Sequence, residues 1–218
     1  MKLFPTGSDG VAQGCPLSAL AGNIVLEDFD RKMNARGITC IRYIDDFILL
    51  GKSRASVEKA LNVARSLLQG LGMDTYDPTK DREKAFSGSI DSGFSFLGYE
   101  LIPGEYPPST KARENLIHQI RILIEDGKRS IAKVMRGAEL RSNERCYAQS
   151  LVAIDNTIKG WRASFRCANS PMQFADLDRK IDRELHDFRR YFLEKMTEAD
   201  GRQRRLATRV QLLKKYTN

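Results

Sequence analysis

Two adjacent aspartates between short apolar runs carry the clearest chemical signal in this sequence. Asp45 and Asp46 directly follow Tyr43 and Ile44, and apolar residues flank the four on both sides. Apolar runs separated by a few turn-forming residues are typical of a tight β-hairpin. Two carboxylates at one turn repel each other, and a divalent cation that prefers hard oxygen ligands, such as Mg²⁺, relieves the repulsion. The pattern predicts a metal-binding hairpin; an ordinary turn is the alternative, since aspartate is common in turns.

A glycine-containing segment precedes the aspartates. Gly10 and Gly14 permit close approach of the backbone to a ligand, and Gln13 offers both a donor and an acceptor. Taken alone, the segment also fits the start of an ordinary helix.

Together the two segments resemble the reverse transcriptase family, in particular the bacterial enzymes of group II intron type. In that family a segment Q-G-x-x-x-S-P-x-x-x-N opens the helix beside the nucleotide. The residues that match it here are Gln13, Gly14, Ser18 and Asn23. Ala12 and Ala19 stand where the family usually has proline, and neither departure removes a chemical group.

The resemblance implies roles for particular residues. Asp45 and Asp46 would be catalytic ligands of a two-Mg²⁺ site, and Lys80 would be a cation near the departing pyrophosphate. Tyr43 and Ile44, with the matched segment, would contact nucleotide and template. The family's primer-grip hairpin is resembled by Phe96, Leu97, Gly98 and Tyr99. From the residues alone, a solvated surface lysine and a core strand are the alternatives.

The first half of the sequence predicts an α+β layer. Hydrophobic periodicity and turn signals give helices at 18–33 and from 53 to about 71, and strands at 38–43, 47–50, 84–90 and 94–102. Such a pattern predicts a small antiparallel sheet with helices on one face, as in a polymerase palm.

The second half predicts an all-α bundle. Ser109 is the expected cap of the first of three amphipathic helices with matching apolar stripes. Pro103 and Pro108 bracket the expected boundary. The predicted domains are a partial palm at 1–104, a thumb or maturase-like domain at 105–198 and a basic tail at 199–218.

Positive charge is concentrated in that second half. Residues 1–100 hold 12 Lys and Arg against 13 Asp and Glu, whereas residues 101–218 hold 24 against 15. Such an excess is typical of a surface that follows a phosphate backbone. Trp161 fits the apolar stripe, whereas Lys159, Arg162 and Arg166 lie beside it and are the expected phosphate contacts.

The resemblance also implies that something is missing. In the family a further aspartate, on a strand before the matched segment, bridges both metal ions, and a fingers region holds the triphosphate. Only nine residues precede Gly10. The sequence is therefore expected to form a half-site, and to lack activity without a second chain that supplies fingers and the missing aspartate.

The expected function is an RNA-directed DNA polymerase that acts on an RNA template, a DNA primer duplex and deoxynucleoside triphosphates. The alternative is a catalytically inactive, maturase-like RNA-binding protein. A nucleotide cyclase is disfavoured because the thumb-like helices would remain unexplained.

Composition favours a cytoplasmic protein without a membrane span. No apolar run approaches the roughly 20 residues of a spanning helix, and the first ten residues do not resemble a signal peptide. The spacing of the four cysteines is unlike that of a zinc site, and we expect them to be reduced thiols. They are Cys15, Cys40, Cys146 and Cys167.

Overall fold

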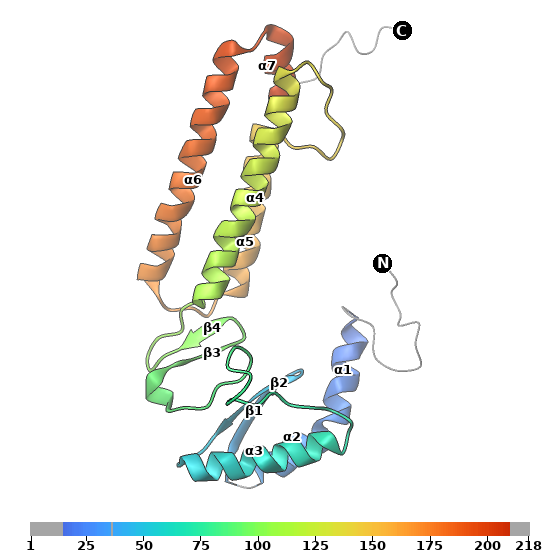
Figure 1. Cartoon of the computed structure of the whole chain (residues 1–218), viewed down its shortest axis with the longest axis vertical. Coiled ribbons are helices and arrows are strands. Elements are labelled where there is room, and N and C mark those ends of the chain that lie inside the picture. The colour runs from blue at the N-terminus through green and yellow to red at the C-terminus, as the bar shows by residue number, and fades with distance from the viewer. Residues whose placement is uncertain (1–14, 36, 210–218) are drawn as a thin grey trace. The chain divides into compact units, whose positions relative to one another are not determined.

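The computed structural model describes residues 15–35 and 37–209, and it divides into two compact units at residues 88 and 89 (Figure 1). The first unit combines helices with an antiparallel hairpin, and the second is a helical bundle that begins with another hairpin. The predicted fold class, α+β followed by a helical bundle, is confirmed. Gln13 and Gly14 lie outside the described residues. Within the described ranges no helix is long and apolar enough to cross a membrane.

The first unit is built around the predicted hairpin. Its elements are α1 (Pro16–Val25), α2 (Glu27–Asn34), β1 (Thr39–Tyr43), β2 (Asp46–Leu50) and α3 (Arg54–Gln69). The strands pair antiparallel from Thr39 opposite Leu50 to Tyr43 opposite Asp46, so a two-residue turn joins them. Helix α2 contacts β1 and α3 contacts β2. Ser53 caps α3, where the sequence predicted the helix to start.

Strand alternation separates a core face of the hairpin from an open face. Cys40 is buried and Phe47 and Leu49 pack against the core, whereas Ile41 and Tyr43 are exposed. The buried core residues of this unit are Leu26, Phe29, Met33, Ile38, Cys40, Ala60, Ala64 and Leu68. Arg42 shares the core face with Cys40, and Asp46 shares the open face with Tyr43.

The single helix predicted at 18–33 is wrong, because two helices meet at Leu26. The backbone of Leu26 (φ −94°, ψ 3°) leaves the helical region, although its amide still donates to the carbonyl of Gly22. Helix α1 buries none of its residues, whereas α2 buries Phe29 and Met33. The break lets α2 pack into the core independently of α1, which periodicity alone could not reveal.

The strand predicted at 84–90 is also wrong. The amides of Lys84 and Ala85 donate to the carbonyl of Asp81, so the chain forms turns there, followed by the short helix η1 (Ile90–Ser92). The stretch 94–102 forms two strands, β3 (Phe94–Phe96) and β4 (Tyr99–Leu101). Leu97 and Gly98 between them both have positive φ, which is the sign pattern of a type I′ turn.

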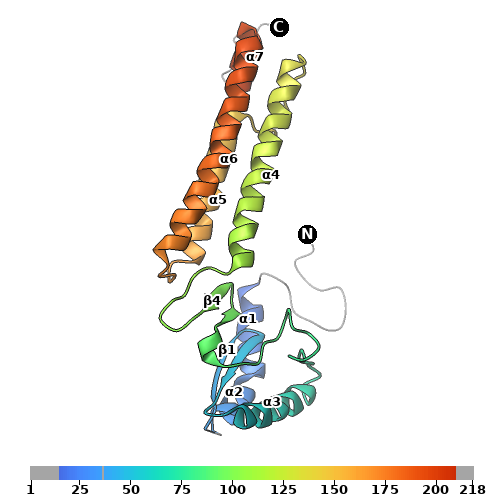
Figure 2. The same ribbon diagram turned by 60° about the vertical axis from the view of Figure 1, so that its left-hand side comes forward.

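Within the described residues, four α-helices follow the β3–β4 hairpin in the second unit. They are α4 (Thr110–Met135), α5 (Tyr147–Ser164), α6 (Pro171–Glu198) and α7 (Gly201–Ala207). The Ser109 side chain accepts a hydrogen bond from the amide of Ala112, which confirms the predicted cap. Helix α4 contacts α5, α6 and α7, and α4 and α6 run side by side in both views (Figures 1 and 2). Trp161 packs against the core of the bundle, as predicted.

Gly127 lets α4 approach its neighbours closely. A methyl group at this position would lie 2.6 Å from Oγ of Ser150 and 2.7 Å from Cζ of Phe188, and both of these residues are fully buried. No such crowding exists at Gly160 on α5, where nothing lies within 4 Å.

We expect Gly127→Ala to lower the free energy of unfolding by about 1–3 kcal/mol, because an added methyl group overpacks the core. Gly160→Ala is the matched control and is expected to raise it by up to about 1 kcal/mol through helix propensity. Urea unfolding followed by circular dichroism measures both. Equal changes in the two variants would contradict the close packing at Gly127.

The cysteines offer a separate probe for each unit. Burial raises the pKa of Cys40, in the first unit, and of Cys146, in the second, to about 11 each. Both thiols are therefore protonated and shielded at neutral pH, whereas Cys167 is exposed.

We expect iodoacetamide at pH 8 to modify Cys167 in the native protein and to reach Cys40 and Cys146 only when their units unfold. Mass spectrometry of digested samples measures the modification at each site, and the urea-unfolded chain is the control. Modification of native Cys40 as fast as Cys167 would disprove its burial.

Candidate metal site and nucleic-acid interface

The turn that carries the aspartates has an unusual backbone. Ile44 has φ +58°, whereas Asp45, the other turn residue, does not have positive φ. This combination is the sign pattern of a type II′ turn, which usually has glycine at the first position. A β-branched residue in the left-handed region is disfavoured by roughly 1–3 kcal/mol. The rest of the unit must therefore hold Ile44 in place.

Arg42 contacts the turn and both helices through a fork of hydrogen bonds. Its Nε donates to Oδ1 of Asp30 over 2.8 Å, and its Nη2 donates to Oδ2 over 2.5 Å. Its Nη1 donates both to the carbonyl oxygen of Ile44, over 2.7 Å, and to Oδ1 of Asn23, over 3.0 Å. The Arg42 side chain is only 8% exposed. One guanidinium thus joins α1, α2 and the aspartate turn.

The Asp30 carboxylate also fixes the charge state of this fork. Its hydrogen bonds to Arg42 raise the pKa of the guanidinium above its already high ordinary value. Arg42 therefore stays charged, and among the described residues its ion pair is with Asp30.

The side chain of Asn34 forms hydrogen bonds with the outward backbone groups of β1. The amide group of Asn34, at the end of α2, accepts from the backbone N–H of Cys40 over 3.0 Å and donates to its carbonyl over 3.3 Å. The side chain thus takes the place of a neighbouring strand at this edge.

Asp45 and Asp46 are exposed, and neither carboxylate has a hydrogen bond or ion pair within the described residues. Two adjacent carboxylates without a protein cation suit a divalent cation with oxygen ligands, so the pair fits part of a Mg²⁺ site. Among the described residues, no group of three or more His, Cys, Asp or Glu side chains could hold a metal. The pair therefore offers fewer protein ligands than a complete two-metal site needs.

Two other residues predicted to contact the nucleotide, Lys80 and Ser18, make no described contact with the aspartate turn. Lys80 lies in a loop shaped by Asp77, whose carboxylate accepts from the amide and hydroxyl of Thr79 over 2.8 and 2.6 Å. The Thr79 hydroxyl, followed by its amide, lowers the pKa of Asp77. Lys80 is exposed and makes no described contact with the aspartate turn. Ser18 lies in the first turn of α1.

The residues that resemble a primer grip form the β3–β4 hairpin of the second unit. Leu97 and Gly98 occupy its turn, and Phe96 and Tyr99 pair across it. The Tyr99 hydroxyl donates to the carbonyl of Ser164 over 3.0 Å, and its ring lies 5.1 Å from that of Phe165. The hairpin is therefore fastened to the end of α5.

The three basic residues expected to contact phosphates differ in whether their side chains have partners within the described part of the protein. Lys159 pairs with Asp155 over 2.6 Å. Arg162 donates to the carbonyl of Phe165 over 2.8 Å and lies 4.6 Å from the ring centre of Phe174. Arg166 is exposed and has no hydrogen bond or ion pair within the described residues. The structure thus leaves Arg166 available to a ligand and gives Arg162 a structural role.

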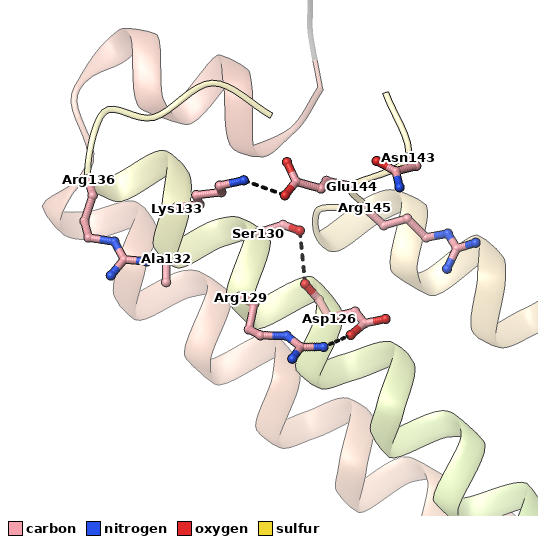
Figure 3. A pocket seen from close by; sticks show the side chains of 9 residues that line it. All are labelled: Asp126, Arg129, Ser130, Ala132, Lys133, Arg136, Asn143, Glu144 and Arg145. Carbon is pink, nitrogen blue, oxygen red and sulfur yellow. Dashed lines mark hydrogen bonds and ion pairs between the residues drawn. The ribbon is translucent and has the colours of Figure 1, made fainter. Parts of the chain in front are cut away.

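A basic hollow beside the end of α4 was missed by the sequence analysis (Figure 3). Within it, Glu144 neutralises Lys133 over 2.6 Å, and Asp126 pairs with Arg129. Arg136 and Arg145 lie on opposite sides, and neither has an ion pair within the described residues. The hollow combines α4 with the loop after it, so no local sequence pattern marks it.

Comparison with known proteins supports one family. Residues 6–101 match the family model described as "Reverse transcriptase (RNA-dependent DNA polymerase)". Protein YkfC of Escherichia coli is 28% identical, in an alignment that covers 46% of this chain and 34% of the relative. The chain therefore spans about a third of the length of this curated relative.

We expect Arg166→Ala to weaken binding of an RNA–DNA duplex and to lower the slope of log affinity against log salt by about one. Arg162→Ala is expected instead to lower the free energy of unfolding by roughly 1–2 kcal/mol, because it removes a charged hydrogen bond and a ring contact. Fluorescence anisotropy over a salt series and urea unfolding separate the two effects.

Arg190→Ala is the control for net charge, since Arg190 is exposed on α6 and pairs with Asp187 over 3.1 Å. A loss of affinity in Arg190→Ala equal to that in Arg166→Ala would show that only the total charge of the chain matters.

Proposed function

Since residues 6–101 match a reverse transcriptase model, we propose that this chain is the palm and thumb part of an RNA-directed DNA polymerase of the group II intron-like type. Its substrates would be an RNA template, a DNA primer and deoxynucleoside triphosphates. The observation that carries the proposal is the exposed pair Asp45 and Asp46 at a turn held in a disfavoured backbone conformation. A two-residue hairpin needs positive φ at its first turn position, where glycine or asparagine is usual; isoleucine is strained there, and such strain concentrates at functional sites.

The carboxylates of Asp45 and Asp46 would hold the metal ions. Bound Mg²⁺ would activate the primer 3′ hydroxyl and stabilise the charge on the departing pyrophosphate. Arg42 donates two hydrogen bonds to Asp30 and makes no described contact with either carboxylate of the pair. Lys80, exposed on its loop, would neutralise or protonate the pyrophosphate.

The second unit would grip the nucleic acid. The turn of β3–β4, with Leu97 at its exposed tip, would lie against the primer strand. Arg166, and Arg136 and Arg145 in the basic hollow beside α4, are cations without an ion pair among the described residues. These contacts would position phosphates without reading base sequence.

A complete site needs a further carboxylate, and the hairpin has an edge that could receive the strand carrying it. With Tyr43 opposite Asp46 beside a two-residue turn, the backbone N–H and C=O groups of Phe47 and Leu49 point outward from β2. Within the described part of the first unit these groups have no hydrogen-bond partner. We propose that this edge takes a strand from a fingers-containing segment, supplied by a second chain or by residues outside those described.

We expect the purified chain alone to give no measurable extension of a DNA primer on an RNA template. Adding a fragment that carries fingers and the further aspartate is expected to restore Mg²⁺-dependent extension, because it completes the set of metal ligands. Gel-resolved primer extension measures both.

Asp45→Asn and Asp46→Asn should each abolish the restored extension, whereas Asp74→Asn, which changes another exposed carboxylate of the first unit, should leave it intact. Extension by the chain alone, lost in Asp45→Ala, would refute the half-site. Restored extension that persists in Asp45→Asn would refute the catalytic role of the turn.

A second function, a maturase-like RNA-binding protein whose carboxylates are relics, is favoured by one observation. The described residues contain two carboxylates at the turn and no complete metal-binding group. In that case Asp45→Asn would leave RNA affinity unchanged, and the wild-type chain would bind no Mn²⁺.

A further inference from the structure

We propose that Arg42 is a positioning residue for the metal-binding turn: it holds Ile44 at positive φ through the Ile44 carbonyl and so sets the direction of the Asp45 and Asp46 carboxylates. The inference rests on the proposed function only where it treats this turn as the metal site. Its structural part, that Arg42 maintains the turn, stands independently.

Ile44 has the wrong residue type for its backbone conformation. Glycine adopts positive φ without a steric penalty, whereas the branched side chain of isoleucine clashes there. The turn carries this disfavoured residue directly before Asp45. Something outside the turn must then stabilise its conformation, and the 2.7 Å hydrogen bond from Nη1 of Arg42 to the Ile44 carbonyl is suited to do so.

The fork can exert this hold because its other end is fixed. Two hydrogen bonds attach Arg42 to the carboxylate of Asp30, and Asp30 lies on α2 beside the buried Phe29. The ring of Phe29 packs against Phe47 of the hairpin at 5.5 Å. Hydrogen bonds through Arg42 and Asp30 thus connect the turn to α2, which is packed in the core of the unit.

The same nitrogen also orients Asn23. Because Nη1 donates to Oδ1 of Asn23 over 3.0 Å, the amide oxygen of Asn23 is occupied, and its Nδ2 has no partner within the described residues. The two N–H donors of this exposed side chain are therefore left for an acceptor oxygen of a ligand, such as a phosphate or sugar oxygen. The orientation of Asn23 and the position of the turn change together if Arg42 is lost.

A purely structural role is the competing explanation. In that case the Arg42–Asp30 pair would fasten α2 to β1 and add stability, with no effect on the turn. Binding of Mn²⁺, used as a probe for the metal site, separates the two explanations when it is compared among folded variants.

The decisive variant is Arg42→Lys, which keeps the charge but cannot form the fork. We expect it to weaken Mn²⁺ binding about five- to tenfold, since a smaller fraction of molecules would have the competent turn. Adding Ile44→Gly should restore affinity to within about twofold of wild type, because glycine adopts positive φ unaided. Mn²⁺ titration of the full chain, followed by electron paramagnetic resonance, measures the affinities.

A second variant guards against loss of folding. Asp30→Asn combined with Arg42→Gln removes both charges together, so no unpaired charge stays buried. It should show the same loss of affinity and the same rescue by Ile44→Gly. Circular dichroism confirms folding of each variant, and Asp74→Asn is the control for nonspecific Mn²⁺ binding.

A measurement without metal tests the structural part. Backbone chemical shifts of Ile44 report its φ angle, which should be positive in wild type and should lose that value in folded Arg42→Lys. Unchanged shifts and unchanged Mn²⁺ affinity in Arg42→Lys would overturn the inference. If wild type and Asp45→Asn bind Mn²⁺ equally poorly, the proposed metal site fails, and the shifts of Ile44 alone then decide whether Arg42 holds the turn.

Discussion

The first unit is organised by the need to pair one buried positive charge. Arg42 occupies the core face of β1, where a hydrocarbon side chain would ordinarily lie, and a buried cation without a partner is strongly destabilising. Asp30 of α2 supplies the counter-charge, and the remaining donors of the guanidinium reach Asn23 and the carbonyl of Ile44. A single requirement of electrostatics therefore links two helices and the turn that carries the candidate metal ligands.

The two units contribute different chemistry. The first presents two exposed carboxylates at a turn with a disfavoured backbone. The nearby cation, Arg42, forms its ion pair with Asp30. In the second unit, long helices pack closely at Gly127, and a hydrogen bond from Tyr99 attaches the hairpin to α5. The surface of this unit retains cations such as Arg136, Arg145 and Arg166 that the described residues do not neutralise. The candidate metal ligands and the candidate phosphate contacts thus lie in different units.

The two carboxylates of Asp45 and Asp46 are a candidate for part of a metal site. Their mutual repulsion favours a divalent cation, yet the charge of two metal ions exceeds what one pair can balance. Within the described residues of the first unit, the outward backbone groups of β2 have no hydrogen-bond partner. Helix α1 also exposes apolar side chains, among them Leu17 and Ile24. Both the electrostatic and the hydrogen-bonding deficits would be met by the same added strand, if it carried an aspartate.

The sequence by itself determined the hairpin, its Asp45–Asp46 turn, the cap at Ser109 and the helical second half, because these depend on residue types and periodicities that act over a few positions. It failed at Leu26, where an unbroken apolar pattern conceals a helix break, and at 84–90, where hydrogen bonds to Asp81 form turns in place of a strand. The tertiary structure alone decided that Arg42 binds Asp30, Asn23 and Ile44, and that Arg162 has partners where Arg166 has none among the residues described. These assignments depend on which distant side chains meet, and packing determines that, not local preference.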